Sequence, residues 1–490
     1  MPRFDDATIE KLFGAEDAEN EDVERFKEYF VSNRAFENLQ SDLPIRVVVG
    51  HKGVGKSALL KRAFLSDGDT DQLAVWIQPN DIAGLGGSKE IEFNQRIENW
   101  KNGILKIIAE KATNKFIDKN SEKYFDNIDL ARNPIRAITG ILKRIKSEEL
   151  QITNEIVLDN FFEEQVISVY IDDVDRGWSA SYTDIQNISA LLNAIRDLAG
   201  QDKRLMFRVG LRSDVYFLVR TSDESTDKIE RQIIWVEWTN NEILRLIAKR
   251  IETFFDPDAD TQHIETMSQK AISSEILSKI MTPKFEGLGH WSDRYIHHVL
   301  LSLCRKRPRD LVKLLHAAAR NAFKEDQVTI SSNNFEKAFE PYSHERMQDV
   351  INEFKSELPS IKSLLLSMRP TKKGRKTAES FLFSNDSMVI KIKEIISHNN
   401  LFFKNGSAAT PKSIIHFLYK IDFITARRDI KGEADALGPR TGRIDRKYFD
   451  QSRFLANESV EFGYGWEIHP AYRWALQPQD VHQVLDSLGV

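Results

Sequence analysis

The chain has 490 residues and a mass of 56.5 kDa, which corresponds to about three domains at roughly 150 residues each. Its 69 basic and 74 acidic side chains give a net charge of −5, which excludes a uniformly basic nucleic-acid-binding protein but leaves room for a local basic patch. The single cysteine, Cys304, excludes an internal disulfide and any site built from several cysteines, as expected for a cytoplasmic protein. No apolar run is long enough for a membrane span, and we expect neither a membrane contact nor a signal peptide.

The first segment, residues 1–40, is acidic and helical in pattern. Residues 5–28 carry ten acidic and three basic side chains, which is typical of a solvated helix face with a loop. Apolar residues return at Val23, Phe26 and Tyr29, three residues apart, and this spacing predicts a helix that packs one face on a neighbour.

Five short β-branched runs follow, each of the kind found in strands that are buried on both faces of a parallel sheet. They lie at residues 45–49, 73–77, 166–171, 205–211 and 233–236. Helical patterns separate them, including residues 56–64 and 184–198. Strands that alternate with helices predict an α/β core with a parallel sheet over residues 41–240, with a mainly helical insertion at about 90–164.

The remaining chain changes pattern twice. Residues 241–345 lose the strand signal and predict an all-α lid. Residues 346–490 form a third unit, in which a helix at 413–420 leads through two expected strands, at 423–426 and 466–468, joined by a long Gly-rich and charged loop. A helix followed by a strand pair with a long connection predicts a C-terminal winged-helix-like domain.

The strongest motif begins where the first strand ends and reads G-H-K-G-V-G-K-S from Gly50 to Ser57. Glycines let the loop turn its N–H groups towards phosphate oxygens, and the helix that follows adds a favourable dipole. Lys56 would contact the β- and γ-phosphates and Ser57 a Mg²⁺ ion. A glycine-rich turn without a ligand is the alternative. The expected nucleotide-binding residues are Gly50, His51, Lys52, Gly53, Val54, Gly55, Lys56, Ser57 and Ala58.

A second motif is an apolar strand that ends in acids, V-Y-I-D-D at residues 169–173. We expect this strand to border the one that precedes the glycine-rich loop, with Asp172 holding the metal together with Ser57 and Asp173 orienting the attacking water. A strand followed by an Asp-rich turn is the plain alternative. Asp175 would also serve the water and Arg176 would face phosphate or a neighbouring subunit, unless the two form a local ion pair.

These two motifs together resemble P-loop ATPases of the AAA+/STAND branch, and most of all the KAP-type and origin-recognition-like bacterial ATPases. The resemblance extends to V-G-L-R-S-D at the end of the fourth strand, where Arg212 would sense the γ-phosphate. It extends also to R-P-R-D-L from Arg307, where Arg309 would reach the nucleotide from the lid. Arg220 and Arg231 are candidates for an arginine finger.

The resemblance implies an enzyme, a Mg²⁺-dependent ATPase that works as a molecular switch, with ATP and Mg²⁺ as cofactors. Its catalytic residues would be Lys56, Asp172, Asp173 and Arg309. The chain departs from the family in lacking inserted membrane helices and terminal sensor repeats, and in having Asp-Asp where most AAA+ motors have Asp-Glu, which favours slow turnover. The implied setting is antiviral defence or another nucleic-acid-linked process, with a homo-oligomer or an effector protein as partner. Alternatives are an origin-recognition-like DNA-binding loader or initiator and a non-hydrolysing scaffold that binds ATP.

Weaker signals leave two interpretations open at each place. The basic run at 369–376 and the stretch at 427–447, which has seven basic and four acidic residues, would contact DNA or form solvated loops. Tyr29, Phe30 and Phe36 would form an adenine pocket or plain core. The neighbours His297 and His298 point apart on a helix and do not predict a metal site.

Overall fold

The computed structural model describes residues 3–16, 20–69, 73–120, 166–222, 224–370, 380–430, 434–435, 438–439, 443–450, 463–477 and 484. The chain divides into two compact units. Unit 1 comprises residues 1–33, 50–55 and 235–490, and unit 2 comprises residues 34–49 and 56–234. The four-part division expected above follows changes in residue pattern along the chain and stays a prediction.

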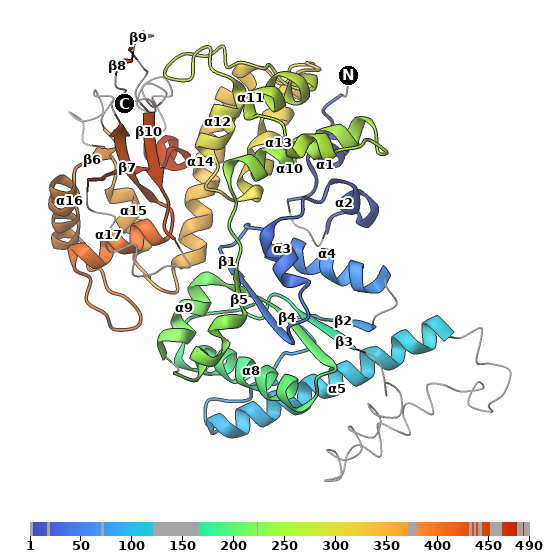
Figure 1. Ribbon diagram of the computed structural model, residues 1–490. Helices are drawn as coiled ribbons and strands as arrows, with labels where there is room; N and C mark the ends of the chain where they lie inside the picture. The colour runs from blue at the N-terminus through green and yellow to red at the C-terminus, as the bar shows by residue number, and fades with distance from the viewer. Residues whose placement is uncertain are drawn as a thin grey trace. The chain divides into compact units, whose positions relative to one another are not determined.

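Unit 2 is built on a five-stranded sheet of almost entirely apolar strands (Figure 1). The strands are β1 (Ile45–Gly50), β2 (Leu73–Ile77), β3 (Ile167–Ile171), β4 (Leu205–Arg212) and β5 (Ile233–Trp235). Their spatial order is β2-β3-β4-β1-β5, and β3 pairs in parallel with both β2 and β4. The expected α/β class with a parallel sheet is confirmed. The expectation that β3 borders β1 is wrong, because β4 lies between them.

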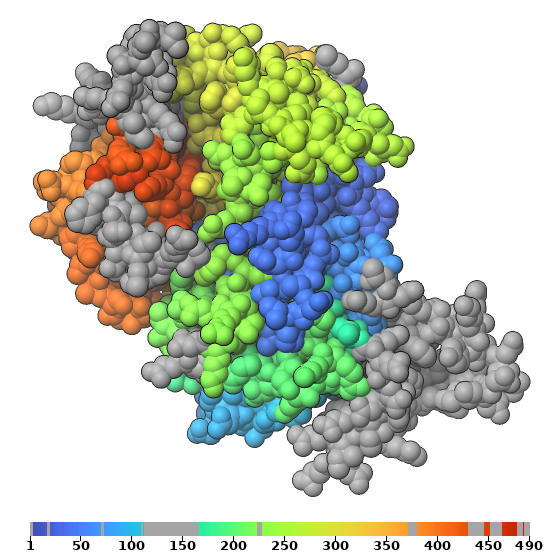
Figure 2. Space-filling model, in the orientation of Figure 1, coloured from blue at the N-terminus to red at the C-terminus, as the bar shows by residue number. Residues whose placement is uncertain are grey.

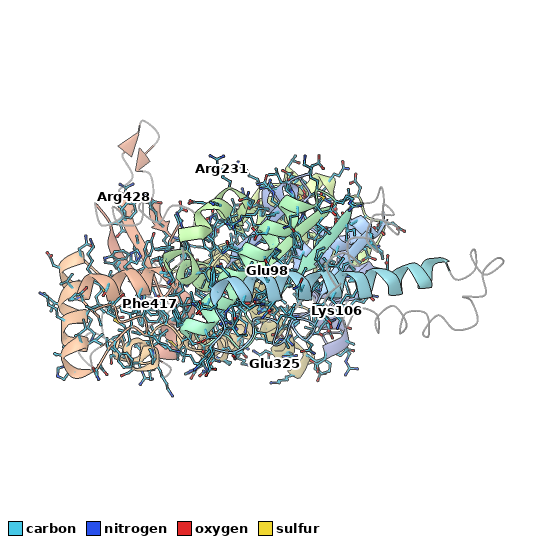
Figure 3. All side chains as sticks on the ribbon, turned by 90° about the horizontal axis from the view of Figure 1, so that it is seen from below. Glu98, Lys106, Arg231, Glu325, Phe417 and Arg428 are labelled. Carbon is cyan, nitrogen blue, oxygen red and sulfur yellow. The ribbon has the colours of Figure 1, made fainter. Side chains whose placement is uncertain are left out.

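Helices cover both faces of this sheet (Figure 1). They are α3 (Arg34–Leu39), α4 (Lys56–Asp69), α5 (Phe93–Asn120), α8 (Tyr182–Gln201) and α9 (Ser213–Ser222), with the 3₁₀ segment η3 (Glu224–Gln232). α4 packs on one face, while α5 and α8 pack together on the other. A reciprocal cap between Ser181 and Asp184 starts α8. Figure 3 shows α5, which carries Glu98 and Lys106, as the long helix that begins the expected insertion; residues 121–164 lie outside the described part.

Unit 1 contains the expected helical region. Its helices up to residue 367 are α1 (Asp6–Phe13), α2 (Val23–Tyr29), α10 (Asn240–Phe255), α11 (Gln269–Ala271), α12 (Ile296–Leu303), α13 (Pro308–Lys324), α14 (Ser332–Phe354) and α15 (Ile361–Ser367). Single 3₁₀ or π turns, η4 (Gln262–Glu265), η5 (Ile272–Ile276) and η6 (Leu277–Lys279), complete the region. α1 packs against α10 and α13, and α13 packs along α14.

The acidic N-terminal segment is less solvated than its composition indicates. Glu21 and Arg25 are buried. The Arg25 guanidinium donates to the carbonyl of Arg250 and to the Thr253 hydroxyl, both at 2.6 Å. A charged side chain can occupy a buried place when its donors are satisfied in this way, so charge counts alone did not predict the packing of α2 on α10.

The C-terminal part of unit 1 carries a second, antiparallel sheet. Its elements are β6 (Leu382–Phe383), α16 (Asn385–His398), α17 (Pro411–Lys420), β7 (Ile424–Ile430), β10 (Arg443–Lys447), β11 (Gly465–Ile468), η9 (Pro470–Tyr472) and α18 (Arg473–Leu476), with the separate pair β8 (Ala434–Asp435) and β9 (Gly438–Pro439). The strand order is β10-β7-β11-β6. The expected pairing of the two strands after α17 is confirmed in β7 and β11, while β10 is an additional strand in the connection that was expected to be a loop.

Buried charges hold this second sheet. Glu467 on β11 is fully buried and pairs with Arg427, Arg446 and Arg473. Burial alone would raise the pKa of Glu467, but the three guanidinium groups lower it to about 2. The helices α15, α16 and α17 and the strands β7 and β11 form one continuous body, coloured orange to red in Figure 2.

A buried histidine makes the stability of this part sensitive to acid. The N–H of Ala471 donates to His469 Nδ1 at 3.1 Å, which leaves the proton on Nε2, 2.9 Å from the Tyr448 hydroxyl. Burial and the charge of Arg305 lower the pKa of His469 to about 3, against 6.5 in a solvated histidine. The unfolded chain therefore binds more protons than the folded chain below about pH 6.5, and stability is lost as the pH falls.

We predict that His469→Gln removes part of this acid sensitivity, because glutamine keeps donor and acceptor groups without titrating. Between pH 7 and pH 5, the unfolding free energy of the wild type should fall by about 2 kcal/mol more than that of the variant. Urea unfolding at the two pH values measures the difference. Parallel losses in both proteins would contradict the assignment.

Candidate functional site

The glycine-rich motif spans the boundary between the two units, which falls between Gly55 and Lys56. In unit 1, Gly53 and Gly55 adopt φ values of +79° and +102°, where side chains with a Cβ are strained. The indole N–H of Trp238 donates to the carbonyl of Val54 at 2.7 Å and is buried. The two glycines and this indole therefore fix a loop of the shape that can direct backbone N–H groups at an anion.

The other side of the loop meets buried charges of unit 1. Glu353, at the end of α14, accepts a hydrogen bond from the N–H of Lys52 at 3.1 Å and lies 3.8 Å from the ring of His51. Arg307, the residue before α13, binds Glu353 at 3.2 Å and Asp422 at 3.0 Å. His51 was expected to bind nucleotide, but its ring lies buried between Glu353 and Asp422.

Arg309, on the first turn of α13, lies against the same loop. Its N–H is 3.4 Å from the carbonyl of Gly53, and its side chain lies 3.1–3.2 Å from the place where a Cβ on Gly53 would stand. Its guanidinium donates to the carbonyl of Glu16 at 3.0 Å. A side chain at position 53 would therefore push against Arg309. Both this contact and the positive φ angle favour glycine at this position.

The second half of the motif and the acidic motif meet in unit 2. Lys56, Ser57 and Ala58 form the first turn of α4. The Ser57 side chain is hydrogen-bonded to the carboxylate of Asp172, and the charge of Lys56 acts on that carboxylate. Asp172 is buried, and burial raises its pKa even though Ser57 and Lys56 lower it. The structure thus brings the carboxylate of Asp172 to the side chains of Lys56 and Ser57, although Asp172 lies 116 residues after Lys56 in the sequence.

A glycine on β4 allows this meeting. Ile171 pairs with Val209, so the next residue, Asp172, lies beside Gly210. A Cβ on Gly210 would stand 2.3 Å from the Asp172 carboxylate and 2.9 Å from a methyl group of Leu60. Because β4 lies between β1 and β3, only a residue without a side chain leaves room for Asp172 to reach the first turn of α4.

The residues after Asp172 fall into an exposed pair and a buried network. Asp173 has a φ of +58°, and its side chain is half exposed, 3.3 Å from that of Arg176. Asp175 is buried, and burial raises its pKa to about 6 in spite of the nearby Arg212. Arg212 binds Asp175 at 3.2 Å and Asp214 at 2.6 Å. The proposed γ-phosphate sensor is thus held by two buried carboxylates.

The remaining candidates occupy ordinary structural places. Arg220 pairs with Glu230 at 2.8 Å, and Arg231 is exposed. Tyr29 is buried beneath the guanidinium of Arg250, and Phe36 belongs to the core of unit 2. Cys304 is buried, which raises its thiol pKa to about 12. Within the described ranges no three His, Cys, Asp or Glu side chains group as a metal site, and no helix is long and apolar enough for a membrane.

Sequence reasoning assigned no role to five residues that shape the site. They are Gly210, Trp238, Arg307, Glu353 and Asp422. Gly210 is the one with a sequence signal, since a glycine inside a strand often marks the close approach of another group. The others contact the loop from 184 or more residues away, and only the fold brings them there.

Comparisons with known proteins give partial similarities. Residues 241–351 match the family model described as the FunZ-associated C-terminal helical domain. The putative transposon gamma-delta 80.3 kDa protein of Escherichia coli (strain K12) is 22% identical over 531 positions, covering 98% of this chain and 70% of that protein. Allergen Alt a 2 of Alternaria alternata is 26% identical over 152 positions, covering 31% of this chain and 71% of that protein.

Two solved structures of the Aeropyrum pernix ORC2 protein are also similar over most of the chain. The form with ADPNP and ADP has a TM-score of 0.42 and 10% identity, covering 95% of this chain and 93% of that one. The ADP form has a TM-score of 0.34 and 11% identity, covering 93% and 92%.

We predict that Gly210→Ala destabilises the chain by about 2 kcal/mol, because the new methyl group overlaps the Asp172 carboxylate. The cost should shrink in an Asp172→Ala background, where that overlap is absent, and a double-mutant cycle of thermal unfolding measures the coupling. Gly200→Ala in α8, whose Cβ would meet nothing within 4 Å, is the matched control and should not destabilise. Equal costs in both backgrounds would refute the proposed contact.

Proposed function

We propose that the chain binds ATP with Mg²⁺ and hydrolyses it slowly as a conformational switch. The observation that carries this proposal is the hydrogen bond between Ser57 and Asp172 beside Lys56, at the start of a helix that follows a glycine-rich loop. A hydroxyl and a carboxylate are oxygen ligands of the kind that Mg²⁺ takes, and a lysine beside them suits the β- and γ-phosphates. The motif Gly50 to Ala58 would supply the N–H groups around the phosphates.

The residues present fit a bound metal. One carboxylate oxygen of Asp172 is buried without a hydrogen-bond partner, and burial of such an oxygen is costly unless a ligand or water satisfies it. Ser57 and Asp172 would hold Mg²⁺, which when bound neutralises charge on the phosphates. Asp173, exposed just after β3, would orient the attacking water, whereas Asp175 is buried and paired with Arg212 at 3.2 Å.

Two arginines would report the state of the phosphates. Arg212 is held by Asp175 and Asp214, and a γ-phosphate would compete with these carboxylates for its guanidinium. Arg309 would sense the nucleotide from α13, and its packing on Gly53 supports that role. Hydrolysis followed by release of the phosphate would remove negative charge from this region and would thereby shift the helical lid between two positions.

A second candidate function is that of an origin-recognition-like DNA-binding ATPase. In support, α17 leads into the antiparallel pair β7 and β11, the outline of a winged helix. Arg428 is half exposed on β7 (Figure 3), and both it and Lys447 lie over the ring of Tyr464, at 4.7 and 4.5 Å from its centroid. The E. coli relative carries the name of a transposon, which fits a nucleic-acid-linked setting as well as defence.

For either function, we propose a location in the cytoplasm and a further protein partner, which would be a second copy of this chain or an effector protein.

For the ATPase, we predict that Lys56→Ala weakens ATP binding at least tenfold, because it removes the cation beside the phosphates. Asp172→Ala should retain binding of ATP but lose Mg²⁺-dependent turnover, and Asp173→Asn should bind normally and turn over far more slowly. Fluorescence titration and phosphate release measure the two effects. Lys203→Ala, at an exposed position, and Asp197→Asn, at a partly exposed one, are matched controls and should resemble the wild type.

Two outcomes would change the account. Unchanged ATP affinity in Lys56→Ala would exclude the proposed binding loop. Equal phosphate release from the wild type and Asp173→Asn, with normal binding in both, would favour a scaffold that holds ATP without hydrolysing it.

For DNA, we predict salt-dependent binding that the double variant Arg428→Ala/Lys447→Ala weakens. The slope of log affinity against log salt should fall in magnitude by about 1 to 2, since each lost phosphate contact removes roughly one released counterion. Lys324→Ala, exposed on α13, should leave the slope unchanged. Absence of DNA binding by the wild type at low salt would contradict the function of a DNA-binding ATPase.

A further inference from the structure

Four charged or titratable side chains from distant segments meet behind the glycine-rich loop, all within unit 1. We name them the loop bracket: His51 in the loop, Arg307 before α13, Glu353 at the end of α14, and Asp422 between α17 and β7. All four are buried, with exposed fractions of 2–6%. Buried charges are costly unless they pair, so their convergence on one loop calls for a physical explanation.

The bracket grips the loop by its backbone as well as by its histidine. Glu353 accepts from the N–H of Lys52 at 3.1 Å with one oxygen and binds Arg307 at 3.2 Å with the other. Arg307 also lies 3.4 Å from the carbonyl of Lys52 and 3.0 Å from Asp422. Both polar groups of one loop residue are therefore held by the bracket.

The backbone is strained at two places next to the bracket. Asp422 has a φ of +57°, and Lys306, directly before Arg307, has a φ of +55°. Left-handed conformations cost free energy in residues other than glycine and persist where the surroundings impose them. The strained backbone at Lys306 and Asp422 thus accompanies the placement of the Arg307 and Asp422 side chains at the loop.

The charges of the bracket do not balance while His51 is neutral. Arg307 contributes one positive charge, and Glu353 and Asp422 one negative charge each, so the sum is −1; a protonated His51 brings it to zero. The groups that face His51 include Glu353 at 3.8 Å, Asp422 at 3.7 Å and Arg307, with the ring of Phe354 beside them.

His51 is neutral without a ligand, because burial and the charge of Arg307 lower its pKa, and the two carboxylates only partly oppose this. A triphosphate bound on the loop would add several negative charges nearby, and nearby negative charge favours the protonated imidazole. Charging the ring would at the same time neutralise the bracket.

We propose that Arg307, Glu353 and Asp422 are positioning residues for the phosphate loop, and that nucleotide binding is coupled through them to the uptake of a proton by His51. This inference rests on the proposed ATP site. It makes nucleotide affinity rise as the pH falls towards the range in which the free protein's His51 itself takes up a proton. It also ties the loop to the turn between α17 and β7, so the C-terminal sheet shares in the change.

The test is titration calorimetry of the full chain with a slowly hydrolysed ATP analogue in excess Mg²⁺, in two buffers of different ionisation enthalpy, from pH 6 to 8. The wild type should take up a fraction of a proton, and its affinity should rise several-fold, up to about tenfold, across a pH unit of the coupled range. His51→Gln should take up none and show a flat profile.

Asp422→Asn provides a second, independent variant, because asparagine tolerates the same positive φ. Without that carboxylate His51 holds a proton less well, so uptake should be smaller and move to lower pH. Glu357→Gln is the matched control: this carboxylate pairs with Lys420 at 2.8 Å on the same part of unit 1, outside the bracket, and its loss should leave uptake unchanged.

The outcomes separate the inference from the function on which it rests. Failure of the wild type to bind the analogue would refute the proposed ATP site. Binding without proton uptake in the wild type would overturn the inference alone, whether or not the variants fold. Uptake in folded His51→Gln equal to that of the wild type would do the same.

Discussion

One hydrogen bond, between the Ser57 side chain and the Asp172 carboxylate, joins the start of α4 to the end of β3. It requires a buried carboxylate, which is unfavourable unless positive charge and hydrogen bonds compensate it; Lys56 and Ser57 provide both. It also requires Asp172 to reach past the intervening strand, which Gly210 permits. The proposed nucleotide chemistry depends on this contact, because it holds the buried carboxylate beside the lysine at the start of α4.

The glycine-rich loop is fixed independently from its other side. The indole of Trp238 holds the carbonyl of Val54, and Glu353 holds the N–H of Lys52. A loop restrained by groups on α14 and next to α10 can respond to a ligand only by moving them or by changing their charge. These restraints support the proposal that the chain is a switch whose nucleotide state would be transmitted to the helical region and to the turn that contains Asp422.

The sequence predicts those parts of the fold that a periodic pattern of apolar residues determines. It predicts much less well the parts that contacts between distant residues determine. The five apolar runs and the helices between them identified the parallel sheet, because burial on both faces leaves a strong apolar signature. The order of β4 and β1 across the sheet leaves no such signature. In the same way, Lys56, Ser57 and Asp172 follow from local motifs, whereas Arg307 and Glu353 look like ordinary helix-end charges until the fold brings them to the loop.

The most direct test of the central claim is a structure of the chain with Mg²⁺ and a slowly hydrolysed ATP analogue. The account predicts the metal at about 2.0–2.1 Å from the Ser57 hydroxyl, with Asp172 bound to it directly or through a water and Lys56 at the terminal phosphates. A triphosphate bound away from the loop, or a metal that contacts neither Ser57 nor Asp172, would contradict the account.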